Sequence, residues 1–260
     1  MRKLLLVPLF LLSYLPSFAQ YELEINNIRA RNEQNGLLFN NTMEFEGGFE
    51  APIDSAMHTF YAFNLWVSGL NSASNPKAYG TKFLQSTGET NRFGPMMDSI
   101  YYETENDIWD RVWNISREEI ENHISNYDIA GYVLPEVIEN WPAHGDISKG
   151  QAANLAPSID VDGNGTYEPT LGDYPSILGD QAIYSIYNGE RFNENMTPMG
   201  IESHVMTYAF DCDEQLENVI FLYAKHYNRS NTSYSDSYLG FYADLDIGNY
   251  ANDSILTDVD

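Results

Sequence analysis

Cysteine is almost absent from this chain of 260 residues, which contains Cys212 and no other. A single cysteine cannot form an internal disulfide bond, so a hydrophobic core, a bound metal ion or both must hold the fold together. Asp211 and Asp213 flank Cys212, whereas reactive cysteines occupy electropositive surroundings. The chain is therefore not expected to use a cysteine nucleophile.

Basic residues are also scarce, with 13 Lys and Arg against 38 Asp and Glu and a formal net charge of −25 at pH 7. Proteins that bind nucleic acids or anionic membranes present a basic surface, so neither partner is expected. The excess negative charge favours solubility and the binding of divalent cations. Composition alone does not separate a cation site from an acidic surface that merely keeps the protein dispersed.

Long apolar segments are missing after the first 20 residues, so no membrane span is expected in the mature chain. Residues 1–19 have the three parts of a secretory signal peptide, which are a basic start at Arg2 and Lys3, an apolar run over 4–15 and small residues up to Ala19. We expect cleavage after Ala19 and export to the medium or the outer cell surface.

Residues that favour β-strands are abundant. Hydrophobic residues make up 43% of the chain and aromatic residues 14%, with 19 tyrosines. Short apolar or alternating runs between polar turns predict strands over 21–26, 36–39, 43–46, 59–67, 77–83, 180–187, 202–210, 219–227 and 238–244. This spacing indicates a mainly β fold, an antiparallel β-sandwich with long acidic loops. We expect residues 20–260 to form a single domain of this class.

Helical periodicity is confined to a stretch at about residues 105–140. The spacing of apolar residues and the end signals predict helices over 107–113, 116–127 and 134–140. Ser116 and Glu119 form the pattern of a capping box, and Pro135 stands in the first turn of the last helix. We interpret the stretch as a small helical insertion on one edge of the β domain.

One stretch, 155–175, places Asp, Asn and Gly in alternation between two prolines. Asp160, Asp162, Asn164 and Gly165 match the first half of the calcium-binding pattern D-x-[DN]-x-[DN]-G. Oxygen ligands of this kind favour Ca²⁺ over zinc or copper. The predicted ligands of a structural Ca²⁺ ion are Asp160, Asp162, Asn164, the main-chain carbonyl of Thr166, Glu168 and Asp173.

The loop departs from an EF-hand in two respects. Leu171 stands at the twelfth position, where a bidentate Glu is expected, and we assign that role to Asp173. No helix is predicted on either side, so the loop is interpreted as a cation clamp between non-helical segments. The alternative is an acidic turn without an ion, because Asp, Asn and Gly are also ordinary turn residues.

A second acidic stretch follows the last predicted strand. Asp244, Asp246, Asn249 and Asp253 form a weaker candidate for a cation loop, or donate ligands to the first loop. A solvated turn without an ion explains the same residues.

Motifs for catalysis are missing. The sequence has no G-x-S-x-G, phosphate loop or dinucleotide fingerprint, and its five histidines lack metal-binding spacing. His144, in a Trp-Pro loop beside Asp146, is the one histidine that suggests part of a ligand pocket. Among 38 acidic residues, no particular pair can be assigned to glycoside hydrolysis. We therefore expect the protein not to be an enzyme.

The central block Asp160-Val161-Asp162-Gly163-Asn164-Gly165-Thr166-Tyr167-Glu168-Pro169 resembles a block in large secreted surface proteins of Bacteroidota. Further matching motifs lie at 65–69, 141–145, 155–157, 172–175, 179–182, 228–230 and 244–250. The resemblance implies export and a non-catalytic, largely β architecture. Proteins of this family commonly end in a type IX secretion sorting domain, which is absent here. We expect the chain to be the N-terminal part of a longer protein; the alternative is export by another route.

These observations predict a secreted or cell-surface β module, stabilised by calcium, in an adhesin-like or surface-layer protein. Extracellular glycans or other surface proteins are the expected partners. One alternative is a carbohydrate-binding module with Trp66, Trp141 or surface tyrosines as stacking platforms. Another is a glycoside hydrolase with two carboxylates facing each other across a cleft.

Overall fold

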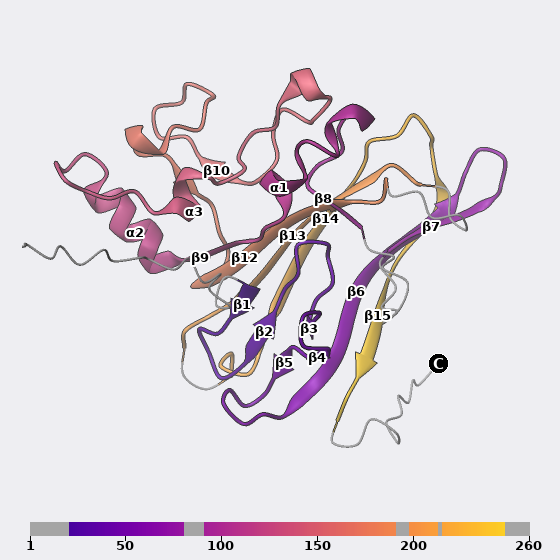
Figure 1. The fold of residues 1–260 in the computed structure, drawn as a ribbon, viewed down its shortest axis with the longest axis horizontal. Coiled ribbons are helices and arrows are strands. Elements are labelled where there is room, and N and C mark those ends of the chain that lie inside the picture. The colour runs from indigo at the N-terminus through magenta and orange to yellow at the C-terminus, as the bar shows by residue number, and fades with distance from the viewer. Residues whose placement is uncertain (1–20, 81–90, 191–197, 213–214, 248–260) are drawn as a thin grey trace, which may run out of the picture.

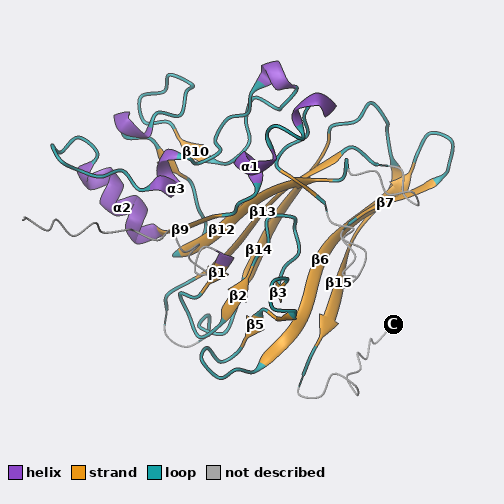
Figure 2. Ribbon diagram, in the orientation of Figure 1, coloured by secondary structure: helices purple, strands orange, loops and turns teal. Residues whose placement is uncertain are grey.

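The structure, a computed structural model, describes residues 21–80, 91–190, 198–212 and 215–247 (Figure 1). The predicted signal peptide lies outside these residues. Helices are few and strands dominate, as Figure 2 shows. The prediction of a mainly β fold with antiparallel sheets is confirmed.

Two antiparallel sheets form the body of the molecule. Sheet 1 has the order β1-β2-β5-β6-β15, with β7 also paired to β6. Its strands are β1 (Glu22–Leu23), β2 (Arg29–Arg31), β5 (Phe49–Glu50), β6 (His58–Leu70), β7 (Pro76–Tyr79) and β15 (Ser235–Leu245). Sheet 2 has the order β14-β13-β12-β8, with β9 also paired to β12. Its strands are β8 (Arg92–Phe93), β9 (Trp113–Ser116), β12 (Gln181–Asn188), β13 (Ile201–Ala209) and β14 (Phe221–Asn228).

The two sheets pack against each other in a sandwich-like arrangement. Val67 and Tyr79 of sheet 1 share a buried cluster with Tyr187 and Val205 of sheet 2. A buried hydrogen bond from Thr207 Oγ1 to Asn32 Oδ1, at 2.7 Å, also joins the two layers. Apolar contacts and polar pairs together therefore fix how sheet 1 lies on sheet 2.

A third layer covers the other face of sheet 2 (Figure 1). It carries α1 (Asn106–Trp109), α2 (Arg117–Asn126), α3 (Glu136–Glu139), and the small strand pair β10 (Ser158–Ile159) and β11 (Tyr174–Pro175). Trp113, Ile138 and Trp141 pack with Tyr184 of β12 in the core beneath this layer. The helical stretch was predicted at an edge of the β domain, but it lies over a face.

This position explains the sequence of β12. Ala182, Tyr184 and Ile186 pack under the helical layer, whereas Ile183 and Tyr187 point to sheet 1. Successive side chains of a strand point to opposite faces, and both faces of β12 are covered. Residues 182–188 are therefore all buried. A strand covered on both faces has a nearly continuous apolar sequence, which is the pattern of this segment.

The long strands agree with the sequence expectations to within about three residues at each end, a normal margin for element boundaries. The short ones differ. Residues 42–45 form the turn between β3 (Asn40–Asn41) and β4 (Glu46–Gly47), so only Glu46 of the predicted strand 43–46 lies in a strand. Only Leu38 of the predicted strand 36–39 makes ladder pairs, and these are isolated bridges.

The helical predictions were partly correct. Helix α2 begins after Ser116, whose side chain accepts from the Glu119 amide while the Glu119 carboxylate accepts from the Ser116 amide, so the capping box is confirmed. The helix predicted over 107–113 ends at Trp109, and Trp113 begins β9. Pairing of β9 with β12 replaces the last turn of that helix, a case of sheet contacts overriding a helical stripe. None of the helices in the described parts of the chain is long and apolar enough to cross a membrane.

Candidate functional site

The acidic loop 160–173 connects β10 to β11 and lies against the helical layer. The pairs Ser158↔Pro175 and Ile159↔Tyr174 hold its two ends together. Tyr167 Oη donates to the main-chain oxygen of Ile138, at 2.8 Å. The His123 Nε2 atom of α2 lies 3.0 Å from the main-chain oxygen of Asp173. The loop is therefore fastened to both α2 and α3.

Asp160 organises the first half of the loop. Its Oδ1 accepts from the Gly163 amide at 2.8 Å, and its Oδ2 accepts from the Gly165 amide at 2.7 Å. The hydrogen bond from Gly165 is the main cause that lowers the pKa of Asp160 below its usual value. Gly163 and Gly165 have φ of 70° and 84°, a region that glycine adopts without strain.

Asp173 organises the second half. It is 1% exposed, and its Oδ1 and Oδ2 accept from the amides of Val161 and Glu168, both at 2.8 Å. These bonds tie the start of the loop to its end. Asp173 is the residue that we predicted as a replacement for the bidentate ligand; both of its oxygens accept from the backbone, as do both oxygens of Asp160.

The side-chain amide of Asn164 lies between the carboxylates of Asp162 and Glu168. Its Nδ2 donates to Asp162 Oδ2 at 3.0 Å and to Glu168 Oε2 at 2.8 Å, while its Oδ1 accepts from the Thr166 amide at 2.7 Å. The six predicted ligands thus belong to one hydrogen-bonded loop.

The negative charge of this loop has no cationic partner among the described side chains, because none of their ion pairs includes Asp160, Asp162, Glu168 or Asp173. Within residues 21–80, 91–190, 198–212 and 215–247, no three His, Cys, Asp or Glu side chains converge as they do at a metal site. The loop is preorganised, but its carboxylates are turned to amide groups.

The second acidic stretch is only partly described. Asp244 and Asp246 lie at and just beyond the end of β15, where the Asp246 amide donates to the Thr59 oxygen at 3.1 Å. Asn249 and Asp253 lie outside the described residues.

The aromatic and histidine candidates Trp141, Trp66 and His144 contact other parts of the fold. Trp141 is 4% exposed and donates to the oxygen of Pro157 at 3.0 Å, so it offers no face for stacking a sugar. Trp66 is partly buried and packs against Gly80. His144 forms an isolated β-bridge with Asn154, and its Nδ1 atom lies 3.2 Å from the Ala153 oxygen.

A buried charge cluster in β13 was missed by the sequence analysis. Glu202 is fully buried, and its carboxylate lies 2.8 Å from both His204 Nε2 and Arg229 Nη2 and 2.7 Å from the Met96 amide. Burial raises the pKa of Glu202, but the bonds from His204 and Arg229 outweigh burial and lower it below its usual value. Tyr184 Oη lies 2.9 Å from His204 Nδ1, so the cluster extends to β12.

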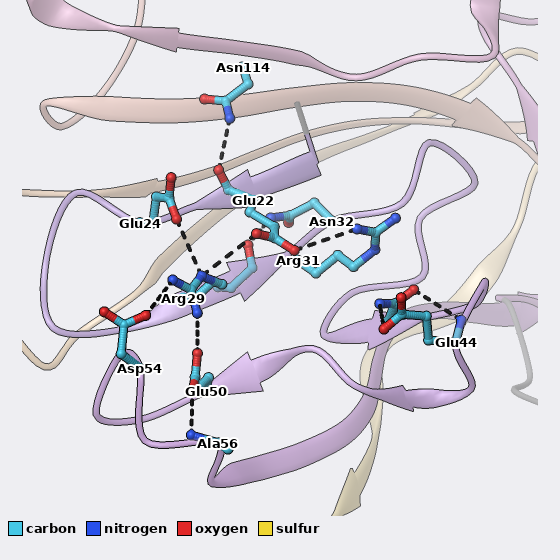
Figure 3. Close-up of polar contacts among 12 residues, drawn as sticks. Glu22, Glu24, Arg29, Arg31, Asn32, Glu44, Glu50, Asp54, Ala56 and Asn114 are labelled. Atoms are coloured by element: carbon cyan, nitrogen blue, oxygen red, sulfur yellow. Dashed lines mark hydrogen bonds and ion pairs between the residues drawn. The ribbon is translucent and has the colours of Figure 1, made fainter. Parts of the chain in front are cut away.

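A second charge cluster lies in sheet 1 (Figure 3). Arg29 pairs with Glu24 at 3.3 Å, with Asp54 at 2.9 Å and with Glu50. The Glu22 carboxylate stands between two guanidinium groups, 3.7 Å from Arg29 and 3.6 Å from Arg31. Burial raises the pKa of Glu22, although Arg31 and Arg29 act in the opposite direction.

Both clusters had a signal in the sequence. Arg29 and Arg31 occupy positions i and i+2, and so do Glu202 and His204. Residues at this spacing share one face of a strand, so two charged groups in an otherwise apolar strand indicate a paired network. The spacing identifies such a network, but it does not reveal the distant partners Arg229 and Asp54.

No family model, curated protein or solved structure matches this chain.

Proposed function

We propose that the protein is an exported, non-catalytic β module of a surface protein, and that Ca²⁺ bound by the loop 160–173 stabilises it. The ion takes the place of the Asn164 amide between Asp162 and Glu168, and Asp160 together with the Thr166 oxygen completes the oxygen ligands. Export rests on the signal-peptide pattern of residues 1–19.

The main observation behind the proposal is that the loop 160–173 holds negative charges in fixed positions without a described Lys or Arg partner. Asp162 and Glu168 are held within hydrogen-bonding distance of one amide group, at 3.0 and 2.8 Å. A divalent cation would neutralise carboxylates that no described basic side chain neutralises. The backbone bonds to Asp160 set the turn beforehand, so little ordering would remain for the binding step.

The role of the ion follows from what the loop touches. Tyr167 and Asp173 connect it to α3 and α2, so fixing the loop also fixes the helical layer over sheet 2. An ion that binds only the folded chain stabilises it by mass action, by about 2.7 kcal/mol at about 100 times Kd. For a domain of this size that corresponds to a rise in Tm of about 5–10 °C.

Thermal unfolding with Ca²⁺ and with EDTA tests the proposal. We expect Ca²⁺ to raise the Tm of the wild type by this amount and to leave the Tm of an Asp160→Asn, Asp162→Asn double variant unchanged. Glu118→Gln with Glu121→Gln, on the exposed face of α2, is the control with the same change of charge. Equal Tm values for the wild type in Ca²⁺ and in EDTA, at matched ionic strength, would refute the calcium site.

A further inference from the structure

The strand β15 forms a free edge of sheet 1 (Figure 1). It pairs with β6 on one side, and no strand of the described residues pairs with it on the other side. Between register shifts near its two ends, residues 238–244 pair with β6 without interruption. Alternate residues of a strand direct their main-chain N–H and C=O groups to each side, so this edge offers a regular row of donors and acceptors.

Two other edge strands are protected against pairing, and β15 is not. β1 is two residues long, and the side chains of Asn114 and Gln181 donate to the main-chain oxygen of Glu22. β14 carries Lys225, a residue type that opposes pairing at an edge. β15 is 11 residues long and contains no Lys, Arg or Pro. Its length and composition therefore leave the edge open to another strand.

The face of β15 that points to sheet 2 is apolar but uncovered. Leu239 pairs with Val67 of β6, whereas Phe241 pairs with Leu65 and stacks on the Phe63 ring. Paired residues direct their side chains to the same face, and Val67 and Leu65 pack between the two sheets. Leu239 is nevertheless 75% exposed and Phe241 70%. The core between the sheets therefore ends before β15, and one further strand would extend it.

Charge decides between a second copy of this chain and a different protein. Asp236 and Asp244 lie near the two ends of β15, and neither takes part in an ion pair within the described ranges. Antiparallel pairing of two copies of β15 about Gly240 would bring Asp236 of each copy close to Asp244 of the other. Like charges at such positions destabilise a strand pair, and each chain has a formal net charge of −25. A strand with a basic residue at each end would complement both aspartates.

We propose that β15 binds an extended segment of another protein, which adds a strand to sheet 1. The segment has apolar side chains at alternate positions beside Leu239 and Phe241, and a basic side chain near each of Asp236 and Asp244. Main-chain hydrogen bonds contribute affinity, and the alternate side chains and end charges contribute specificity. A lipid or a glycan has no row of amide groups with which to match this edge.

Calorimetric titration of the full chain with synthetic peptides tests the proposal. The probe is Lys-Val-Thr-Val-Thr-Val-Thr-Val-Lys, blocked at both ends, and its control has Glu in place of both Lys. We expect Kd of about 10–100 µM for the probe and binding at least about tenfold weaker for the control. In an Asp236→Asn, Asp244→Asn variant the two peptides should bind within about twofold of each other. Glu118→Gln with Glu121→Gln, which changes the charge equally, should retain the difference.

N-methylation separates strand pairing from general apolar contact. Methyl groups on the valine amides block one edge of the peptide, and methyl groups on the threonine amides block the other. One of these two peptides should bind as the unmethylated probe does, and the other should not bind. Leu239→Gln should weaken binding of the probe about tenfold, whereas Val133→Gln, at a position that is 82% exposed, should leave binding unchanged. Both side chains are exposed, so both variants should fold with a Tm close to that of the wild type.

The proposal is overturned if the probe does not bind, if the two methylated peptides bind alike, or if Leu239→Gln and Val133→Gln bind the probe equally well. Sedimentation of the chain alone should show a monomer. A wild-type dimer that Leu239→Gln dissociates would assign the edge to a second copy and overturn the proposal. Tighter binding of a peptide with the sequence of residues 248–260 would overturn it in favour of the chain itself.

Discussion

The acidic loop and the Glu202 cluster place carboxylates in opposite ways, although both adjoin the same helical layer. In the loop, the carboxylates of Asp160 and Asp173 accept from backbone amides, and no described Lys or Arg side chain pairs with them. In the cluster, the fully buried Glu202 lies between His204 and Arg229. The two buried carboxylates are thus satisfied differently, Asp173 by backbone amides and Glu202 by His204, Arg229 and one backbone amide.

The difference follows from the cost of burial. A carboxylate buried without a partner costs several kcal/mol, so Glu202 requires cationic and hydrogen-bonding neighbours. Asp162 is exposed and Asp160 is partly exposed, so both stay hydrated, whereas the buried Asp173 is held by two backbone amides. Consequently the loop carries negative charge that is not paired with any described Lys or Arg side chain, whereas the charge of Glu202 is paired with Arg229.

The substitution Glu202→Gln removes the charge of the buried carboxylate and should have the largest effect on the free energy of unfolding. The Gln amide would set its NH₂ group against one of the donors Met96, His204 or Arg229. We expect the free energy of unfolding to fall by about 3 kcal/mol at pH 7. Chemical denaturation measures it, with the exposed Glu118→Gln, expected within about 0.5 kcal/mol of the wild type, as control.

The same variant tests the pKa of Glu202. Because the folded state lowers this pKa below 4.5, the carboxylate contributes stability above that pH and loses it as the pH falls further. The stability gap between wild type and Glu202→Gln should therefore shrink from pH 7 towards pH 3. A gap that stays constant or widens on acidification would show that the charge of Glu202 does not stabilise the fold.

Substitutions in the loop should have smaller effects, and a pair with equal change of charge separates the roles of the carboxylates. Asp173→Asn replaces one acceptor by a donor that faces the Val161 or the Glu168 amide, and should cost about 2 kcal/mol. Asp162→Asn, at an exposed position, should change stability by less than about 0.5 kcal/mol in EDTA. Equal losses in the two variants would contradict the assignment of Asp173 as the residue that closes the loop.

Sequence patterns predicted the elements whose signals are local. The capping box of Ser116 and Glu119 located the start of α2, and alternation located the long strands. The loop 160–173 was recognised from its spacing because the hydrogen bonds of its carboxylates stay within the loop. These features depend on residues that are close together in the sequence, so they can be predicted from a single sequence.

Features that depend on distant neighbours were missed. Trp113 belongs to a helical stripe in sequence, but pairing with β12 makes it part of a strand. Trp141 was a candidate platform for a sugar, yet it packs on Tyr184, with ring centroids 5.3 Å apart. Arg29 pairs with Glu24 and with Asp54, and no local sequence pattern connects Arg29 to Asp54.

Calorimetric titration of the apo protein with Ca²⁺ tests the central contrast most directly. The account predicts one Ca²⁺ ion per chain in the wild type and in the control variant Glu118→Gln with Glu121→Gln, with Kd of about 0.1–1 mM as in extracellular modules. It predicts no binding in the Asp160→Asn, Asp162→Asn variant. Absence of binding by the wild type up to about 10 mM Ca²⁺, or equal binding by the loop variant, would contradict it.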